Sequence, residues 1–271
     1  MEILEILGFI GAFVVGLILG LIGSGGSILS VPILVYLFGL NPVTATAYSL
    51  FIVGTTSLIG SIKNLKNKLI DYNTTFLFSV SAVISVYITR RYLINLIPET
   101  VINTNLIMIS KDQLIMLLFS LLMIAAGILM INKTPKTIVR IKQTKTIAPN
   151  KLLIFSEGSL IGFLTGLIGA GGGFIIIPIL VILSNLRMKN AIATSLAIIS
   201  LKSLIGFLGD IQVLEIDWNF LLLFTFISVL GIFIGQKFSE NVPDNTLKIN
   251  FGTFIIAIAF LIIFVELFSF F

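Results

Sequence analysis

Two glycine clusters are the residues whose type and spacing most clearly indicate a binding site. One is Gly-Ser-Gly-Gly-Ser at 23–27 and the other is Gly-Ala-Gly-Gly-Gly at 169–173, each directly before an apolar segment. A helix that begins there has unpaired N–H groups and partial positive charge in its first turn. Glycine also lets a ligand approach the backbone. We therefore expect an anion site formed by Gly23, Ser24, Gly25, Gly26, Ser27, Gly169, Ala170, Gly171, Gly172 and Gly173.

Lys202 is the second candidate, because it stands well inside an apolar segment. A buried ammonium group costs on the order of 2.5–3.5 kcal/mol, so it needs a partner or a ligand. At about 3.6 residues per turn, Ser195 lies on the same helix face as Lys202. Ser49 and Thr56 hold the same two positions in the first of two similar halves. We expect all four side chains to contribute to the anion site. The alternatives are that Lys202 extends to the membrane surface or pairs with Glu157.

Glu157 is a candidate for proton coupling, since a carboxyl group inside a membrane can carry a proton. The alternative is a position in the wet inner interface, because Lys151 is close in the sequence. Trp218 and Glu266 stand near the ends of apolar segments, where we expect them to be interfacial.

Several kinds of chemistry lack their required side chains, because the 271 residues include no Cys and no His. Disulfides, thiolate metal sites, imidazole-ligated metals and Ser-His-Asp catalysis are therefore excluded. No P-loop sequence occurs, so the chain itself has no motif for using ATP. We expect no metal site, no cofactor and no enzymatic activity, although no sequence feature excludes a lipid substrate.

The composition predicts an all-α integral membrane protein. Hydrophobic residues make up 57% of the chain and charged residues 11%, against about a quarter charged in soluble domains. The apolar residues also form long runs, as a bilayer requires. The net charge of +5 comes from basic residues in short loops, which determine topology and do not indicate a nucleic-acid partner.

Ten apolar segments are predicted to be helical. Two of them, 28–40 and 174–186, would each cover roughly 20 Å as helices, against a hydrocarbon core of about 30 Å. Each follows a glycine cluster and contains a proline, so we expect broken or re-entrant helices. The full set is 3–22, 28–40, 44–62, 74–97, 112–131, 152–169, 174–186, 190–209, 218–236 and 249–271.

The chain repeats itself at an offset of 146 residues. The sequence GLIGSGGSILSVPILV at 20–35 aligns with GLIGAGGGFIIIPILV at 166–181, and 21 of the 41 positions from 20 to 60 are identical. We therefore expect a first membrane repeat at 1–131 and a second at 152–271, each with about five helical segments. A basic linker, 132–151, joins them.

Loop charges predict that the two repeats have inverted topology. The linker 132–151 carries six basic residues and no acid, so we expect it to be cytoplasmic. The loop at 63–71 is also net basic, whereas its counterpart at 209–217 carries only acids. Equivalent loops would then lie on opposite sides, with both termini outside. The basic pair Arg90 and Arg91 falls near the outer end of its helix, which this arrangement tolerates but does not predict.

The two glycine motifs, each followed by A-x-A-x-S-L, resemble the TauE/SafE family of sulfite exporters over nearly the whole chain. The resemblance implies a carrier in a prokaryotic inner membrane, or an organellar relative, that moves sulfur-containing anions such as sulfite or sulfonates without ATP. The family pattern often has Asn at the position of Lys202. This departure suggests a different anion or a different mode of coupling.

The sequence therefore predicts a secondary transporter of a small, sulfur-containing anion, with alternating access at the repeat interface. The alternatives are an anion channel, or a carrier of another small organic acid or of a lipid-linked anion. Expected partners are the anion, a coupling ion (proton or sodium) and the bilayer of the cell membrane, with no nucleic acid. The sequence leaves the oligomeric state open.

Overall fold

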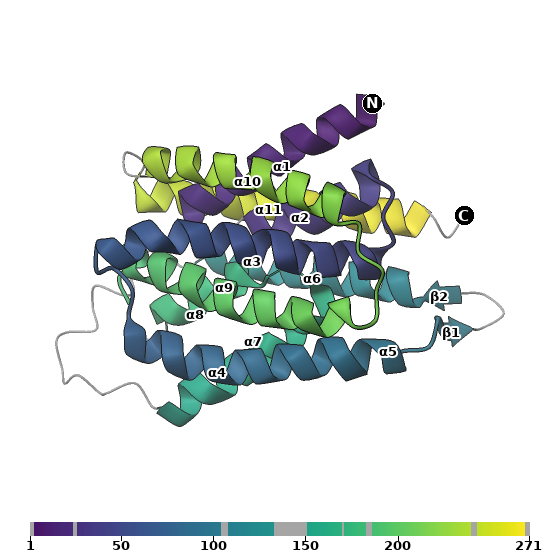
Figure 1. Cartoon of the computed structure of the whole chain (residues 1–271), viewed down its shortest axis with the longest axis horizontal. Helices are drawn as coiled ribbons and strands as arrows, with labels where there is room; N and C mark the ends of the chain where they lie inside the picture. Colours follow the sequence, from purple (N-terminus) through teal and green to yellow (C-terminus); the bar gives the residue numbers. More distant parts are fainter. Residues whose placement is uncertain are drawn as a thin grey trace.

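The protein is a bundle of helices that lie along one long axis (Figure 1). A computed structural model describes residues 3–23, 26–103, 108–132, 151–169, 171–182, 186–239 and 243–268. Six of the described helices are long and apolar enough to cross a bilayer. The prediction of a helical integral membrane protein is confirmed.

Each of the ten predicted segments coincides with helical structure. The second and the fourth contain a π-helical turn, labelled η1 and η2. The elements are α1 (Ile3–Ile22), α2 (Gly26–Pro32), η1 (Ile33–Leu37), α3 (Pro42–Lys66), α4 (Tyr72–Ile88), η2 (Thr89–Leu93), α5 (Ile94–Leu96), α6 (Lys111–Asn132), α7 (Lys151–Ile168), α8 (Gly173–Ile182), α9 (Met188–Ile211), α10 (Trp218–Ser239) and α11 (Asp244–Phe268).

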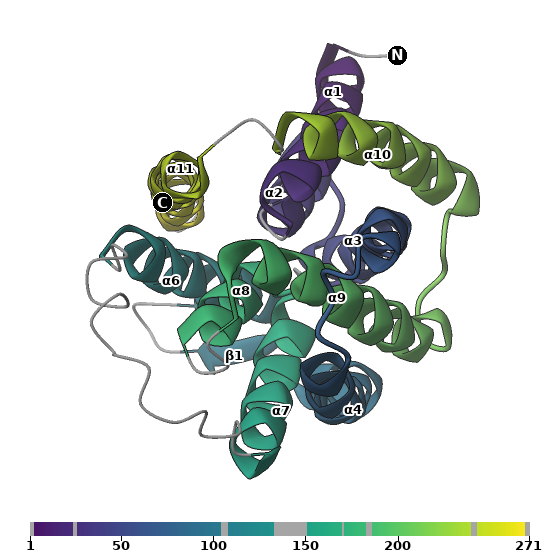
Figure 2. The same ribbon diagram turned by 90° about the vertical axis from the view of Figure 1, so that its left-hand side faces the viewer.

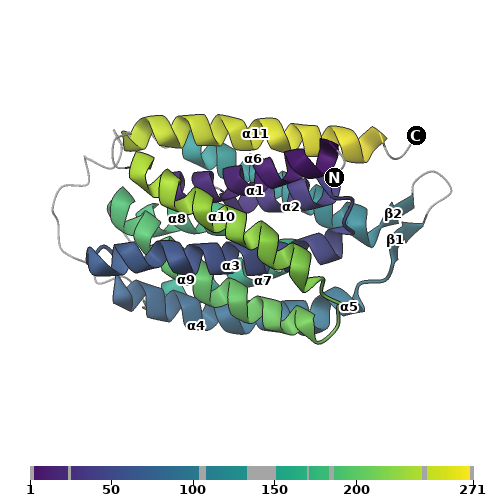
Figure 3. The same cartoon turned by 45° about the horizontal axis from the view of Figure 1, so that its top comes forward.

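A short antiparallel hairpin of β1 (Thr100–Asn103) and β2 (Met108–Ser110) was not predicted. It extends beyond the ends of the helices between α5 and α6 (Figure 3). Pro98 has no N–H group to continue a helix, and the residues that follow include β-branched ones. Hydropathy alone marks only the apolar segments on either side.

The N-terminal caps of α4 and α10 are equivalent. The side chain of Asp71 accepts a hydrogen bond from the Thr74 N–H group at 2.8 Å, and that of Asp217 accepts one from Phe220 at 3.1 Å. A capping carboxylate stabilises the first turn of a helix. Asp71 and Asp217 are 146 positions apart, and so are Thr74 and Phe220. The offset seen at the glycine motifs therefore extends to the starts of these helices.

Helices α3 and α9 form the centre of the bundle. The apolar windows of α3 and α9 are 72% and 67% buried, against 33–39% for the other four candidate spans. Viewed along the bundle, α2 and α8 lie beside them, surrounded by the pairs α1 and α10, α4 and α7, and α6 and α11 (Figure 2). The two short helices are thereby enclosed by protein.

Small residues allow the outer pairs to approach closely. A Cβ atom on Gly16 of α1 would collide with the carbonyl group of Ser228 on α10. Likewise, a Cβ atom on Gly162 of α7 would overlap the backbone of Ala82 on α4. Such contacts are typical of helix pairs in membranes. In both cases the first long helix of one half packs against the other half.

Equivalent helices run in opposite directions (Figure 1). The Thr194 hydroxyl near the start of α9 accepts a hydrogen bond from the Asp71 N–H group, just after α3 ends. At the other end, Arg90 beyond α4 contacts Asp210 near the end of α9. The N–H group of Asp217, before α10, donates to the Tyr48 hydroxyl near the start of α3. Hence α3 and α9 are antiparallel, as are α4 and α10.

Glu266, which the sequence predicts to be interfacial, is packed against a segment from the first half of the chain. Its side chain is buried, with 9% of its area exposed, and one carboxylate oxygen accepts a hydrogen bond of 3.0 Å from the Tyr36 hydroxyl. Tyr36 lies in η1, 230 positions earlier in the chain. The position of Glu266 within its own segment gives no sign of this distant partner.

We predict that Gly16→Leu disrupts the contact between α1 and α10, because the larger side chain has no space beside the Ser228 carbonyl. Overpacking of this kind typically costs about 1–3 kcal/mol or more. The thermal unfolding temperature in detergent should fall accordingly. Ala125→Leu, on an exposed position of α6, is the control. An equal loss of stability in both variants would contradict the packing role of Gly16.

Candidate functional site

The two glycine turns lie against the central helix of the opposite half. Gly23, which follows α1, has a φ of +80°, and Gly169, which follows α7, has a φ of +70°. These left-handed conformations favour glycine. A Cβ atom on Gly23 would overlap Ile192 of α9, and one on Gly169 would overlap Thr46 of α3. Each helix break is therefore closed by the other half of the chain.

Lys202 reaches the second glycine turn from α9. Its side chain is fully buried, and its Nζ donates a hydrogen bond of 2.7 Å to the Thr165 hydroxyl. A Cβ atom on Gly172 would lie 2.9 Å from this Nζ and would overlap Thr165. Glycine at 172 thus leaves the space in which the ammonium group lies.

This position of Lys202 disagrees with both alternatives considered for it. The side chain does not extend to the surface, and it bonds to Thr165 instead of Glu157. Among the described residues, no carboxylate lies within ion-pair distance of Nζ. Helix α8 begins beside it at Gly173, with the unpaired N–H groups and partial positive charge of a first turn. Both features favour a negatively charged ligand.

Three buried serines of the first repeat lie beside the second glycine turn. The Ser30 hydroxyl lies 2.5 Å from the Ser49 hydroxyl and donates to the Ser27 carbonyl at 2.9 Å. All three side chains are fully buried. A Cβ atom on Gly171 would lie 3.4 Å from the Cβ of Ser27. The structure therefore brings together Ser27, Ser30, Ser49, Gly171, Gly172, Thr165 and Lys202, which we call the central polar cluster.

Other residues predicted for the anion site have no contact with the central polar cluster among the described side-chain hydrogen bonds. Ser195 and Thr56 are buried, but each hydroxyl donates to its own helix, to Ile192 O at 2.8 Å and Ile52 O at 2.6 Å respectively. Gly26 begins α2, where a Cβ atom would collide with the Val15 carbonyl oxygen, so it has a packing role there. The predictions for Ser24, Gly25 and Ala170, and for the linker between 132 and 151, fall on positions outside the described residues.

Glu157 lies on α7, and neither of its carboxylate oxygens has a hydrogen-bond partner in the described part of the chain. The next residue, Gly158, packs closely against Phe78 and Ser81 of α4. The side chain therefore lies next to the α4–α7 contact and away from Lys202. Proton coupling through Glu157 stays a prediction.

A buried ion pair that the sequence reasoning missed joins η2, directly after α4, to α9. Arg90, 1% exposed, donates from Nε to an Asp210 carboxylate oxygen at 2.7 Å. Its Nη1 donates to the Thr46 hydroxyl at 3.1 Å and to the Gly166 carbonyl at 3.3 Å. The signal was an arginine within an apolar helix, because a buried charge requires a partner. The partner itself, 120 positions away, could not be identified from spacing.

Two further serines mark equivalent positions in the central helices. Ser57 of α3 and Ser203 of α9 are both fully buried, and neither hydroxyl has a hydrogen-bond partner in the described residues. They are 146 positions apart and lie next to Thr56 and Lys202. Because buried hydroxyls normally have a hydrogen-bond partner, these two are further candidates for contact with a polar ligand.

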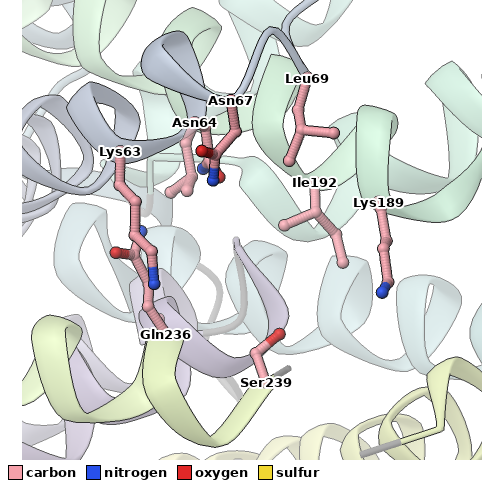
Figure 4. A pocket seen from close by; sticks show the side chains of 10 residues that line it. Lys63, Asn64, Asn67, Leu69, Lys189, Ile192, Gln236 and Ser239 are labelled. Atoms are coloured by element: carbon pink, nitrogen blue, oxygen red, sulfur yellow. The ribbon is translucent and has the colours of Figure 1, made fainter. Parts of the chain in front are cut away.

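A pocket of about 160 Å³ lies away from this cluster, at the end of the bundle where α3 ends and α9 begins (Figure 4). Its lining comes from both halves of the chain. The residues are Gly20, Lys63, Asn64, Asn67, Leu69, Lys189, Ile192, Leu196, Gln236 and Ser239.

Comparisons with known proteins agree with the membrane class. The family model described as "Sulfite exporter TauE/SafE" matches residues 8–262. A probable membrane transporter protein of Xylella fastidiosa strain 9a5c is 27% identical, with 92% of this chain and 91% of the relative covered. The probable membrane transporter protein YunE of Bacillus subtilis is 26% identical, with 96% and 99% covered.

A third relative, a probable membrane transporter protein of Methanocaldococcus jannaschii, is 28% identical over 73% of this chain and 68% of its own length. No solved structure gives a significant match. The names of the relatives indicate a membrane transporter, which implies a small-molecule substrate and a lipid bilayer as surroundings. With a family match over nearly its whole length and a fold of membrane-spanning helices, the chain belongs to the TauE/SafE family of multi-pass membrane transporters.

Proposed function

We propose that the protein is a secondary transporter that moves a small anion across the cell membrane without ATP. The observation that carries this proposal is the Lys202 ammonium group, fully buried and hydrogen-bonded to Thr165 beside the second glycine turn. A buried cation next to a helix N-terminus favours an anionic ligand. The binding centre is the central polar cluster.

The substrate class is proposed from the family. The family description names sulfite, an oxyanion small enough to be held by one ammonium group and a few backbone N–H and hydroxyl groups. We therefore propose sulfite or an organosulfonate as the cargo. Proton or sodium coupling completes the proposal, with Glu157 as the candidate proton carrier, since its oxygens have no protein partner in the described residues.

Alternating access follows from the proposed relation of the two halves as inverted repeats. Three observations support it: the sequence match at an offset of 146, the antiparallel directions of α3 and α9, and the exchange of packing between halves. Transporters built this way bind substrate where broken helices meet and expose the site to each side in turn. From the loop charges we infer that the end of α3 lies on the cytoplasmic side.

We predict that Lys202→Met weakens anion binding at the central polar cluster without unfolding the protein. Methionine fills a similar space, and removing a buried charge that has no carboxylate partner should leave the unfolding temperature equal or higher. Anion affinity, measured by thermal stabilisation with sulfite or methanesulfonate, should fall at least about tenfold, or about 1.4 kcal/mol. Lys66→Met, on the exposed end of α3, is the control. Unchanged affinity in the Lys202 variant would remove this residue from the site.

Transport itself is tested in proteoliposomes. Uptake of labelled sulfite or sulfonate should be saturable and show counterflow, and Lys202→Met should abolish it. Conductance that does not saturate would instead indicate an anion channel.

The inverted arrangement predicts labelling from opposite sides. The chain has no cysteine of its own, so Lys66→Cys and Gln212→Cys, both at exposed positions, each provide a single reactive group. In intact cells, an impermeant maleimide should label position 212 from outside and position 66 only after the membrane is opened. Labelling of both from the same side would contradict the inverted repeats.

A further inference from the structure

The pocket at the end of α3 has an apolar part, from Gly20, Leu69, Ile192 and Leu196, and a part lined by hydrogen-bond donors. Lys63, Asn64 and Asn67 come from the end of α3 and its loop, Lys189 from the first turn of α9, and Gln236 from the end of α10 (Figure 4). Two ammonium groups and three side-chain amides thus surround one recess, and no carboxylate is among its described lining residues. This chemistry favours a small anion.

The pocket also reaches the first glycine turn. Ile192 lines it, and the same side chain would overlap a Cβ atom on Gly23. Gly20, one turn earlier on α1, lines it as well. A ligand held there would therefore lie next to one of the two helix breaks of the proposed transport site.

The same place in the other half of the molecule is closed. Four of the pocket's lining residues are each 146 positions away from one member of the buried Arg90 network. That network consists of Arg90, Asp210, Thr46 and Gly166. The caps of α4 and α10, which follow the same offset, support this alignment. The pairs are Gln236 and Arg90, Asn64 and Asp210, Ile192 and Thr46, and Gly20 and Gly166.

The two places differ in whether a carboxylate side chain of the protein lies in them. In the closed one, the Asp210 carboxylate is held by Arg90 at 2.7 Å and is 4% exposed as a residue. In the open one, Asn64 stands in place of the acid and Gln236 in place of the arginine. The Gln236 amide donates to the Gly60 carbonyl at 2.7 Å. The open place thus has donors and space but no negative charge among its described residues.

We propose that this pocket is a second anion-binding site, at the inner mouth of the transport path, which takes a small oxyanion such as sulfite or a sulfonate. The proposal rests on the proposed anion transport and adds where the anion first binds on the inner side. The Arg90–Asp210 pair closes the equivalent place on the outer side. The structure described here is then open to the inside and closed to the outside.

The test uses the absence of cysteine. Ser239→Cys places one thiol at the pocket edge, and the rate of its alkylation is measured in neutral detergent with increasing sulfite or methanesulfonate. Bound anion should slow alkylation several-fold. Lys63→Gln with Lys189→Gln should weaken this protection at least tenfold. Lys66→Gln with Lys68→Gln, which removes the same charge from residues that do not line the pocket, should leave it unchanged. Asn67→Cys serves as a second reporter if Ser239→Cys does not fold.

A second set of variants tests the equivalence with the closed side. Asn64→Asp supplies the carboxylate found at Asp210 and should abolish protection by added anion. Combining it with Gln236→Arg should recreate the ion pair and slow alkylation even without anion. Protection that survives Asn64→Asp unchanged would overturn the proposal.

The remaining outcomes separate this proposal from the proposed function. Saturable uptake without protection at position 239, or protection unaffected by the Lys63 and Lys189 changes, would overturn the inner site and leave anion transport standing. Protection by a short-chain anionic lipid but not by sulfite or methanesulfonate would also overturn it, since the pocket would then bind a lipid headgroup. Protection without uptake of any tested anion would count against the transport function alone.

Discussion

The architecture depends on one constraint: backbone groups at a helix break cannot face lipid. A bilayer core contains no water to bind unpaired N–H and C=O groups, so broken helices occur there only when protein encloses them. The described part of the chain has two such breaks after glycines with positive φ, at Gly23 and Gly169. The central positions of α2, α8, α3 and α9 in Figure 2, with the longer helices around them, satisfy this requirement.

Neither half encloses its own break. Gly23 packs on Ile192 of α9, and Gly169 packs on Thr46 of α3. The outer helices are exchanged in the same way, with α1 against α10 and α7 against α4 at glycine contacts. The two halves therefore form one structural unit, and a movement of one against the other changes the surroundings of both breaks together. That coupling is what alternating access requires.

The halves differ most informatively where one of them has gained charge. The repeat supplies a frame with two similar glycine turns, and the proposed anion preference and direction rest on the differences between the halves. At the centre, Lys202 and Thr165 stand where the first half has Thr56 and Leu19. At the mouths, an ion pair on one side corresponds to two neutral amides on the other. A similar frame in both halves thus carries different charged groups at equivalent positions, as the proposed anion transport requires.

The sequence by itself determined the helices, the duplication and the broken segments, and it predicts the sidedness of the loops. Each of these follows from composition and spacing over short stretches: apolar length sets the spans, glycine and proline mark the breaks, and charge sorts the loops. It also singled out Lys202, since an ammonium group within an apolar run is costly wherever it points.

Only the tertiary structure decided where those side chains go. It placed Lys202 on Thr165, joined Arg90 to Asp210, and buried Glu266 against Tyr36. Each pair joins segments from different helices, at separations of 37 to 230 positions. Which segments meet depends on how whole helices pack around the two breaks. The local sequence indicates that a buried charge needs a partner, but the packing of distant helices determines which residue that partner is.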